Sequence, residues 1–241
     1  MTKLSVNINK IATIRNARGG DTPNVLQAAK DLENFGAEGI TVHPRPDERH
    51  ITRADAYGLA DVVKTEYNVE GYPSEDFIQM VLEIKPTQVT LVPDGPDVIT
   101  SNAGWDCIKQ KDYLTPIITR FKDVGIRVSI FLDPTVEQVD AALACGADRI
   151  ELYTEAYASH YPTDKESAIA PYKQTAKRAK EMGLGVNAGH DLSLENLNYF
   201  VTEIPETLEV SIGHALISDA LYYGLSNVVG MYKSRLVVSA E

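Results

Sequence analysis

Short runs of β-branched and apolar residues alternate along the chain with amphipathic segments of helical spacing. The runs predict eight strands, at residues 4–9, 39–43, 68–72, 88–93, 127–133, 149–154, 185–188 and 208–213. Between them, apolar residues recur at the i, i+3, i+4, i+7 spacing that marks one buried face of a helix. That spacing predicts helices at residues 25–35, 74–84, 113–124, 136–144, 169–182, 194–201 and 217–232.

Four of the joints between a helix and the next strand carry a glycine. They are Gly36, Gly125, Gly146 and Gly183. Glycine after a helix can adopt the left-handed cap conformation, and here a strand follows almost at once. The joints therefore indicate a weak internal repeat of one helix–glycine–strand unit.

Strands that alternate with helices favour a parallel sheet, and eight of them favour a closed (β/α)8 TIM barrel of the α/β class. The strands are apolar at most positions, as expected when both faces of a sheet are covered. The alternative is an open doubly wound sheet, which would want a glycine-rich GxGxxG turn after the first strand. Here that turn reads NINKIATIRNARGG, so we predict one barrel domain over residues 1–241.

Composition narrows the class of partner. The chain has 241 residues, a net charge of -11 and 44% hydrophobic residues. The acidic balance argues against nucleic acid as a partner, although a few local arginines could still bind small anions. The two cysteines form no CxxC, the N-terminus lacks a signal-peptide core, and no apolar run could span a bilayer. We expect a reduced, soluble, cytoplasmic protein without a membrane partner.

Four of the five histidines lie where a predicted strand gives way to a loop, or close that loop. They are His43, His50, His190 and His214. The unperturbed pKa of histidine lies nearest neutral pH, which suits proton transfer and phosphate contact. Because the active sites of such barrels lie at the C-terminal ends of the strands, these side chains are expected to share one polar site.

The segment HPRPDERH places His43, Arg45, Arg49 and His50 within eight residues. Its two prolines restrict the backbone of the loop. Arginine presents a planar fork that can hold phosphate through two hydrogen bonds. The alternatives are that His43 is only a satisfied polar residue at a strand end and that Arg49 is a solvated surface charge.

Glu70 lies in NVEGY, inside a predicted strand and near its C-terminal end. A carboxylate inside a barrel is costly unless it is paired or has a catalytic role. Burial would raise its pKa toward neutrality and suit it to general-base work. The alternative is a structural ion pair with an inward arginine. Glu151, in IELYT, could also point inward, and it is given no role.

The segments GVNAGHDL and VSIGHALI follow the seventh and eighth strands, where barrels often bind phosphate. Gly213 precedes His214 at the expected start of a helix, and backbone N–H groups at a helix N-terminus bind anions. A small phosphorylated substrate is therefore plausible, although the glycines could serve only tight turns. No HxH or HxxxH pair is present, so we predict no metal site.

Several segments occur in the same order as the blocks of a known family. They are VNINKIATIRNARGG, GITVHPRPDERHI, NVEGY, LVPD with the following VIT, VSIFLD, VNAGHDL and IGHALI. Together they resemble the pyridoxine 5′-phosphate synthases, over about residues 4–235. The HxRxDxRHI block combined with VNAGH and IGHA is not a generic barrel pattern.

The resemblance implies a (β/α)8 barrel that assembles as a homo-octamer. It implies a transferase that condenses 3-amino-2-oxopropyl phosphate with 1-deoxy-D-xylulose 5-phosphate. The products would be pyridoxine 5′-phosphate, inorganic phosphate and water, in the deoxyxylulose-dependent route to vitamin B6. It also implies that the reaction needs no metal and no organic cofactor.

The family's functional positions carry over as follows. His43 resembles the first proton acceptor, Glu70 the second, and His190 the proton donor. The positions that hold the amino-ketone phosphate correspond to Asn7, Arg18, Asp191, Gly213 and His214. The positions that hold the deoxyxylulose phosphate correspond to Arg45, His50 and Thr100.

Two departures from the family pattern bear on the substrates. Asn9 and Lys10 stand where the family commonly has Asp-His contacting the sugar phosphate. Asn9 keeps an acceptor without the charge, and Lys10 keeps a donor but cannot act as a neutral acid–base group. Asp191 stands where glycine is usual, and its carboxylate would repel a phosphate unless only its backbone N–H made the contact.

Two other functions stay open from the residues alone. The first is another phosphosugar barrel enzyme, such as an epimerase or an aldolase. A Schiff-base aldolase needs a lysine inside a strand, and Lys10 is the one candidate near the C-terminal end of a strand. A barrel that binds phosphate esters without turnover is the second, and the Asn9-Lys10 departure keeps it open.

Overall fold

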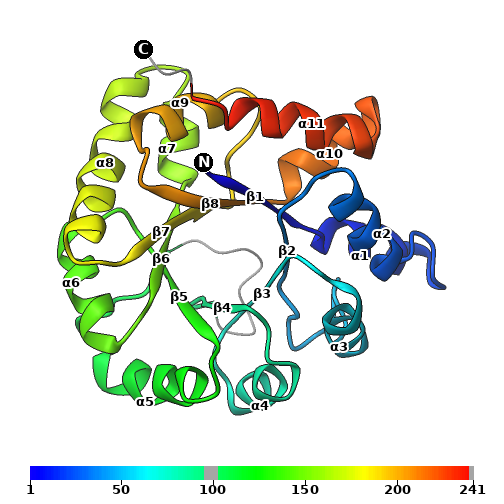
Figure 1. The fold of residues 1–241 in the computed structure, drawn as a ribbon, viewed down its shortest axis with the longest axis horizontal. Helices are drawn as coiled ribbons and strands as arrows, with labels where there is room; N and C mark the ends of the chain where they lie inside the picture. The colour runs from blue at the N-terminus through cyan, green and yellow to red at the C-terminus, as the bar shows by residue number, and fades with distance from the viewer. Residues whose placement is uncertain (95–102, 239–241) are drawn as a thin grey trace.

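In the computed structural model the eight strands form a closed parallel barrel ringed by helices, and residues 1–94 and 103–238 are described (Figure 1). The strands follow chain order around the barrel, and β1 pairs with β8 to close it. The predicted barrel is therefore confirmed. The strands are β1 (Lys3–Asn7), β2 (Gly39–Val42), β3 (Glu66–Gly71), β4 (Gln88–Leu91), β5 (Arg127–Leu132), β6 (Arg149–Tyr153), β7 (Gly185–Gly189) and β8 (Thr207–Ile212).

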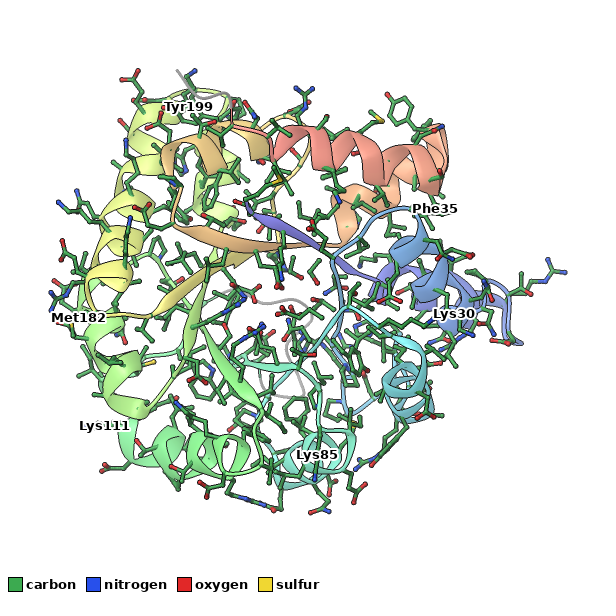
Figure 2. The ribbon with its side chains drawn as sticks, in the orientation of Figure 1. Lys30, Phe35, Lys85, Lys111, Met182 and Tyr199 are labelled. Carbon is green, nitrogen blue, oxygen red and sulfur yellow. The ribbon has the colours of Figure 1, made fainter. Side chains whose placement is uncertain are left out.

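The helices lie outside the strands and cover their outer faces (Figure 1). Charged residues such as Lys30 and Lys85 lie on the outer rim of the helical ring (Figure 2). None of the helices in residues 1–94 and 103–238 is both long and apolar enough to cross a membrane. The helices are α1 (Asn9–Arg18), α2 (Val25–Asn34), α3 (Arg53–Val62), α4 (Glu75–Ile84), α5 (Lys111–Lys122), α6 (Val136–Cys145), α7 (Glu155–His160), α8 (Lys165–Glu181), α9 (Leu197–Glu203), α10 (His214–Tyr223) and α11 (Leu225–Arg235).

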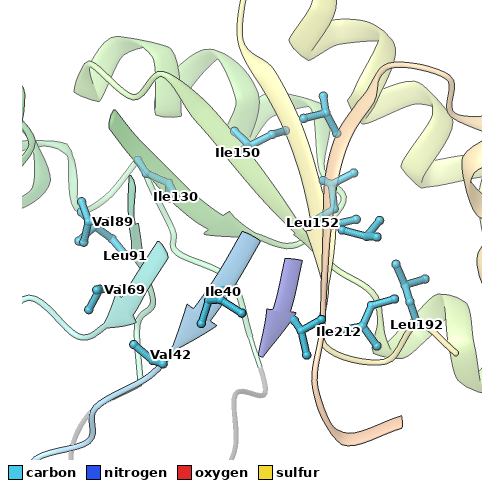
Figure 3. Close-up of a cluster of buried hydrophobic side chains, with 14 of the residues drawn as sticks. Ile40, Val42, Val69, Val89, Leu91, Ile130, Ile150, Leu152, Leu192 and Ile212 are labelled. Atoms are coloured by element: carbon cyan, nitrogen blue, oxygen red, sulfur yellow. The ribbon is translucent and has the colours of Figure 1, made fainter. Parts of the chain in front are cut away.

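Apolar and polar residues alternate along most of the strands, and in β5 Phe131 breaks this alternation. Branched side chains such as Val69, Ile130 and Ile212 are fully buried and belong to the main core (Figure 3). Because successive side chains of a strand point to opposite faces, the residues between them point into the barrel. The sequence indicated strands that are apolar on both faces, but the inward positions are largely polar.

Hydrogen bonds join these inward polar side chains in the middle of the barrel. Ser5 Oγ lies 2.8 Å from Thr41 Oγ1, and Asn68 Nδ2 donates to Thr41 Oγ1 at 3.3 Å. Thr90 Oγ1 donates to Asn68 Oδ1 at 3.0 Å. Buried polar groups are tolerated when they are paired in this way. This layer forms the floor beneath the residues at the C-terminal ends of the strands.

Ion pairs close the opposite, N-terminal end of the barrel. Arg127 contacts Glu66 there, and Arg149 Nη1 lies 3.8 Å from Glu66 Oε1 and 3.7 Å from Glu209 Oε2. Residues at this end of a barrel usually contribute to stability, whereas active sites lie at the C-terminal end. The open end for a ligand is therefore the C-terminal one.

The elements differ from the sequence prediction in several places, and helices α1, α3 and α7 were not predicted. The predicted strand at 4–9 ends at Asn7, because Ile8 caps α1 and Asn9 begins that helix. Helix α3 was not predicted, although Thr52 and Asp55 form a reciprocal capping box at its start. The predicted helix at 217–232 is two helices, α10 and α11, separated by Gly224 at φ +80°.

Candidate active site

A cavity of about 710 Å³ opens among the residues that end the strands. It is lined by groups from β1, β3, β5, β6 and β8, from the loops that follow β2, β4, β7 and β8, and from the first turns of α1 and α10. Most of the site residues that the sequence indicated line this one cavity. They are Asn7, Asn9, Lys10, His43, Arg45, His50, Glu70, His190, Asp191, Gly213 and His214.

Two of the indicated residues are not in this lining. Arg18 is exposed at the C-terminal end of α1, about 12 Å along the helix axis from Lys10 at 1.5 Å per residue. Thr100 lies outside the described residues. The single chain therefore gives no support to a substrate contact by Arg18, and a contact by Thr100 stays a prediction.

His43 and Glu70 face each other at the ends of β2 and β3. Nδ1 of His43 lies 3.9 Å from Oε2 of Glu70, and the two side chains are 10% and 12% exposed. This separation is too long for a hydrogen bond. Asn7 Nδ2 donates to the same carboxyl oxygen at 3.4 Å. The residues that the sequence assigned to proton acceptance therefore form one buried pair.

Burial sets the charge of this pair. Burial lowers the pKa of His43 well below its ordinary value, and the charge of Arg45 lowers it further. Burial also raises the pKa of Glu70 well above its usual value, assisted by the nearby carboxyl of Glu151. In each case the charged form is the one that burial disfavours. Burial therefore favours an unprotonated imidazole beside a protonated carboxyl.

Asn9 ties the end of β1 to the end of β2. Its side-chain Oδ1 accepts a hydrogen bond from the backbone N–H of His43 at 3.0 Å. Its own backbone N–H donates to Asn7 Oδ1 at 3.1 Å. Asn9 therefore holds the main chain that carries His43, a role that the sequence did not predict.

His50 presents one defined tautomer. Its Nδ1 accepts a hydrogen bond from the backbone N–H of Ile51 at 2.9 Å. Burial and the neighbouring charges of Arg45 and Lys10 lower the pKa of His50 to about 4. The ring is therefore neutral at physiological pH and carries its proton on Nε2, where it can donate to an anionic ligand.

The two arginines of the same loop differ in burial. Arg45 and Asp94 form an ion pair at 3.0 Å, with side chains 6% and 2% exposed. Arg49 pairs with Asp47 at 2.7 Å and is 31% exposed. Both arginines line the cavity, so Arg49 is not merely a solvated surface charge.

His190 follows β7 with a backbone φ of +89°, a conformation that few residues other than glycine adopt. Its ring meets Tyr153 edge-on at 5.5 Å between ring centroids, and its Nδ1 lies 2.7 Å from Asp191 Oδ2. Burial lowers the pKa of His190, but the hydrogen bond and charge of Asp191 and the charge of Glu151 outweigh it. The net shift is upward.

The turn between β8 and α10 packs tightly on β1. A Cβ atom added to Gly213 would lie 3.0 Å from Asn7 Cβ and 3.1 Å from Asn7 O. Helix α10 begins at His214, with Gly213 at its N-cap position. The first backbone N–H groups of this helix have no partner within the helix, so the turn is suited to an anion.

Glu151 is a cavity residue for which no role was predicted. It lies on β6, is 3% exposed, and accepts a hydrogen bond from Thr90 Oγ1 at 3.4 Å. Burial raises its pKa to about 7. Its side chain points into the barrel because it alternates along β6 with Ile150 and Leu152. Its nearness to Glu70 depends on how the strands are aligned with one another around the barrel. Further lining residues that the sequence did not identify are Thr13, Val92, Phe131, Ser211 and Ala215.

Two alternatives from the sequence can be compared with this geometry. Lys10 lies in the first turn of α1 and is exposed, so it is not a lysine on a barrel strand. Within residues 1–94 and 103–238, no group of three or more His, Cys, Asp or Glu side chains is arranged to hold a metal ion.

Comparison with solved structures supports the fold. Phosphoribosylanthranilate isomerase from Thermotoga maritima is 14% identical with a TM-score of 0.60, over 98% of each chain. Tryptophan synthase from M. tuberculosis is 13% identical with a TM-score of 0.65, over 99% of this chain and 93% of that one. At these identities the likeness concerns the barrel alone.

Comparison with sequences is more specific. The family described as "Pyridoxal phosphate biosynthesis protein PdxJ" matches residues 4–237. Pyridoxine 5′-phosphate synthase of Bacteroides thetaiotaomicron is 60% identical over 98% of this chain and 100% of that protein. The enzyme of the same name from Christiangramia forsetii is 61% identical over the same shares. The chain therefore belongs to the PdxJ family of pyridoxine 5′-phosphate synthases, enzymes of vitamin B6 biosynthesis.

Proposed function

We propose that the cavity condenses 3-amino-2-oxopropyl phosphate with 1-deoxy-D-xylulose 5-phosphate into pyridoxine 5′-phosphate, phosphate and water. The observation that carries the proposal is that His43, Glu70 and His190 line one cavity together with the arginines of the β2 loop. A space of about 710 Å³ is also within the range of small-molecule sites, which suits two small phosphate esters.

His43 accepts the first proton. Its lowered pKa leaves the imidazole unprotonated near neutral pH, so it can take a proton from the amine as the amine attacks the ketone. Its main chain is fixed by Asn9, which keeps the ring beside Glu70. A base held in this way needs no reorientation before it acts.

Glu70 acts after His43. Its raised pKa favours the protonated carboxyl, which can give its proton to the oxygen that leaves as water. The carboxylate so formed then accepts a proton from carbon in the next step. His43 therefore accepts a proton before Glu70, because the pKa shifts favour an unprotonated His43 and a protonated Glu70 at the start.

His190 donates a proton to a departing oxygen later in the sequence. Arg45 and His50 bind the phosphate of the sugar, which is the phosphate expelled, and Thr100 and the Asn9-Lys10 pair are assigned to the same ester. The start of α10, with Gly213 and His214, binds the phosphate that remains in the product, next to Asn7 on β1. Holding two anions at separate places orients the reactants and lowers the barrier.

The assembly implied by the family resemblance is a cytoplasmic homo-octamer. Support comes from large apolar side chains on α10, where Leu221 is 73% exposed and Tyr222 is 85% exposed. Exposed apolar patches are typical of protein interfaces. Light scattering on the purified protein would give its mass, to be compared with 26.5 kDa for one chain.

The reaction can be tested with both phosphorylated substrates and the absorbance of the pyridine ring. The expected result is a new ring absorbance together with one equivalent of released phosphate. Binding of the substrates without product would contradict the proposal and support a non-catalytic barrel. Trapping of a substrate on Lys10 by borohydride would support the aldolase instead.

Asn9→Ala should lower kcat about tenfold, the scale of one lost hydrogen bond at about 1.4 kcal/mol. The variant removes the acceptor for the His43 N–H, so the ring is held less well. Steady-state kinetics would measure the loss. Asn9→Asp is the matched control, because it keeps that acceptor and should retain most of kcat. Equal loss in both variants would contradict the positioning role.

A further inference from the structure

The residue after His190 places a carboxylate against the histidine ring. Asp191 Oδ2 lies 2.7 Å from His190 Nδ1, the length of a charge-assisted hydrogen bond, and the side chains are 30% and 33% exposed. We propose that Asp191 is a positioning residue that orients His190 through Nδ1 and stabilises its protonated form. The inference rests on the proposed function of His190 as proton donor, and it replaces the predicted phosphate contact of Asp191.

The main chain around Asp191 is held from two sides. Its backbone N–H donates to Thr154 Oγ1 at 3.1 Å, and the Thr154 hydroxyl donates to Gly189 O at 2.7 Å. Asn196 Nδ2 donates to the carbonyl of Asp191 at 3.3 Å. Thr154 and Asn196 are both buried. The carboxylate is therefore presented to His190 from a fixed backbone.

The same contacts make Asp191 a poor phosphate ligand. The backbone N–H through which it could hold an anion is already donated to Thr154. The carboxylate lies at the rim of the cavity, where its charge would repel a phosphate. The carboxylate of Asp191 thus suits a cationic ring better than an anionic ester.

Several charged groups face His190 and decide its titration. Asp191 lies in its own loop, Glu151 lies on β6 and Asp94 follows β4, and all three favour the imidazolium. Burial of the ring disfavours it. Because the net shift of the pKa is upward, the imidazolium persists at higher pH than in a free histidine. Activity that needs this form is present below the pKa and is lost as the pH rises through it.

The proposed step balances without any further reactant. The Glu70 carboxylate takes a proton from carbon, and the C–H electron pair forms a C=C bond to the neighbouring carbon. The C–O bond of that neighbouring carbon breaks, its electron pair goes to the leaving oxygen, and Nε2 of the imidazolium supplies the proton to that oxygen. The ring becomes neutral and keeps its proton on Nδ1, bonded to Asp191. Asp191 itself gains and loses no proton, so it acts only through His190.

The test is a titration of the histidine ring in the intact enzyme. In Asp191→Asn the pKa of His190, followed by NMR of ring-labelled histidine, should fall by about one unit, the scale for losing a neighbouring opposite charge. His190→Gln assigns the signal. Glu195→Gln is the matched control, since it removes an exposed carboxylate from the same loop and should leave this pKa unchanged.

The pH profile of kcat gives the second reading. Its alkaline limb should move to lower pH in Asp191→Asn by the same amount, and Asp191→Glu should restore part of the shift. An unmoved pKa would overturn the proposal. The proposal would also be overturned if Asp191→Asn altered KM for the amino-ketone phosphate but left the alkaline limb of the kcat profile in place. That result would make Asp191 a substrate ligand. The NMR reading needs no turnover, so it still tests the Asp191–His190 pair if the proposed reaction fails.

Discussion

Glu70→Gln is expected to lower kcat by roughly 10²-fold or more, the scale of a lost general acid–base group. Glutamine has nearly the shape of the protonated carboxyl and can still accept from Asn7, but it can neither give up nor take a proton. KM for both phosphorylated substrates should change little, because the phosphate groups bind elsewhere in the cavity. Steady-state measurement of ring absorbance gives both constants.

Two comparisons make the Glu70 result specific. Glu75→Gln removes an exposed carboxylate at the start of α4 and should leave kcat at the parent value. An unchanged melting temperature for Glu70→Gln would show that the barrel is intact. A kcat close to that of the parent enzyme would remove Glu70 from the mechanism and leave it as a buried neighbour of His43.

The barrel could be predicted because its signals are local. Each strand is a short run rich in apolar and β-branched residues, as around Ile150 and Leu152, and four of the helix–strand joints carry a glycine. The errors arose where local signals conflict. Helix α1 has a weak apolar stripe with few buried residues, and the break at Gly224 lies inside an otherwise continuous helical pattern.

The candidate site could be predicted only as a set of residues. Strand ends identify His43, Glu70 and His190 as neighbours, but no sequence pattern indicates that His43 Nδ1 lies 3.9 Å from Glu70. The protonation of this pair depends on burial and on Glu151, which comes from a strand about eighty residues away. The distance between His43 and Glu70 and the protonation of the pair depend on the alignment of the strands and on the directions of the side chains. Both are set only when the strands are assembled into the barrel.

Arg45→Met is expected to raise KM for 1-deoxy-D-xylulose 5-phosphate on the order of 10²-fold. Hydrogen bonds to a charged partner contribute about 1.5–3 kcal/mol, and each 1.4 kcal/mol is a factor of ten. The Arg45 guanidinium is buried and held by Asp94, so little entropy is lost when it binds phosphate. Kinetics at varied sugar phosphate, with the amino-ketone phosphate saturating, would isolate this effect.

Asp94→Asn distinguishes ligand binding from loop support, because it removes the charge from the same ion pair and leaves the guanidinium in place. If Arg45 binds the sugar phosphate, Asp94→Asn should affect KM far less than Arg45→Met. Arg45→Lys should fall between them, since an ammonium keeps the charge but not the planar fork. Equal losses in Arg45→Met and Asp94→Asn would mean that the pair only holds the loop, and the sugar phosphate would then have to bind elsewhere in the cavity.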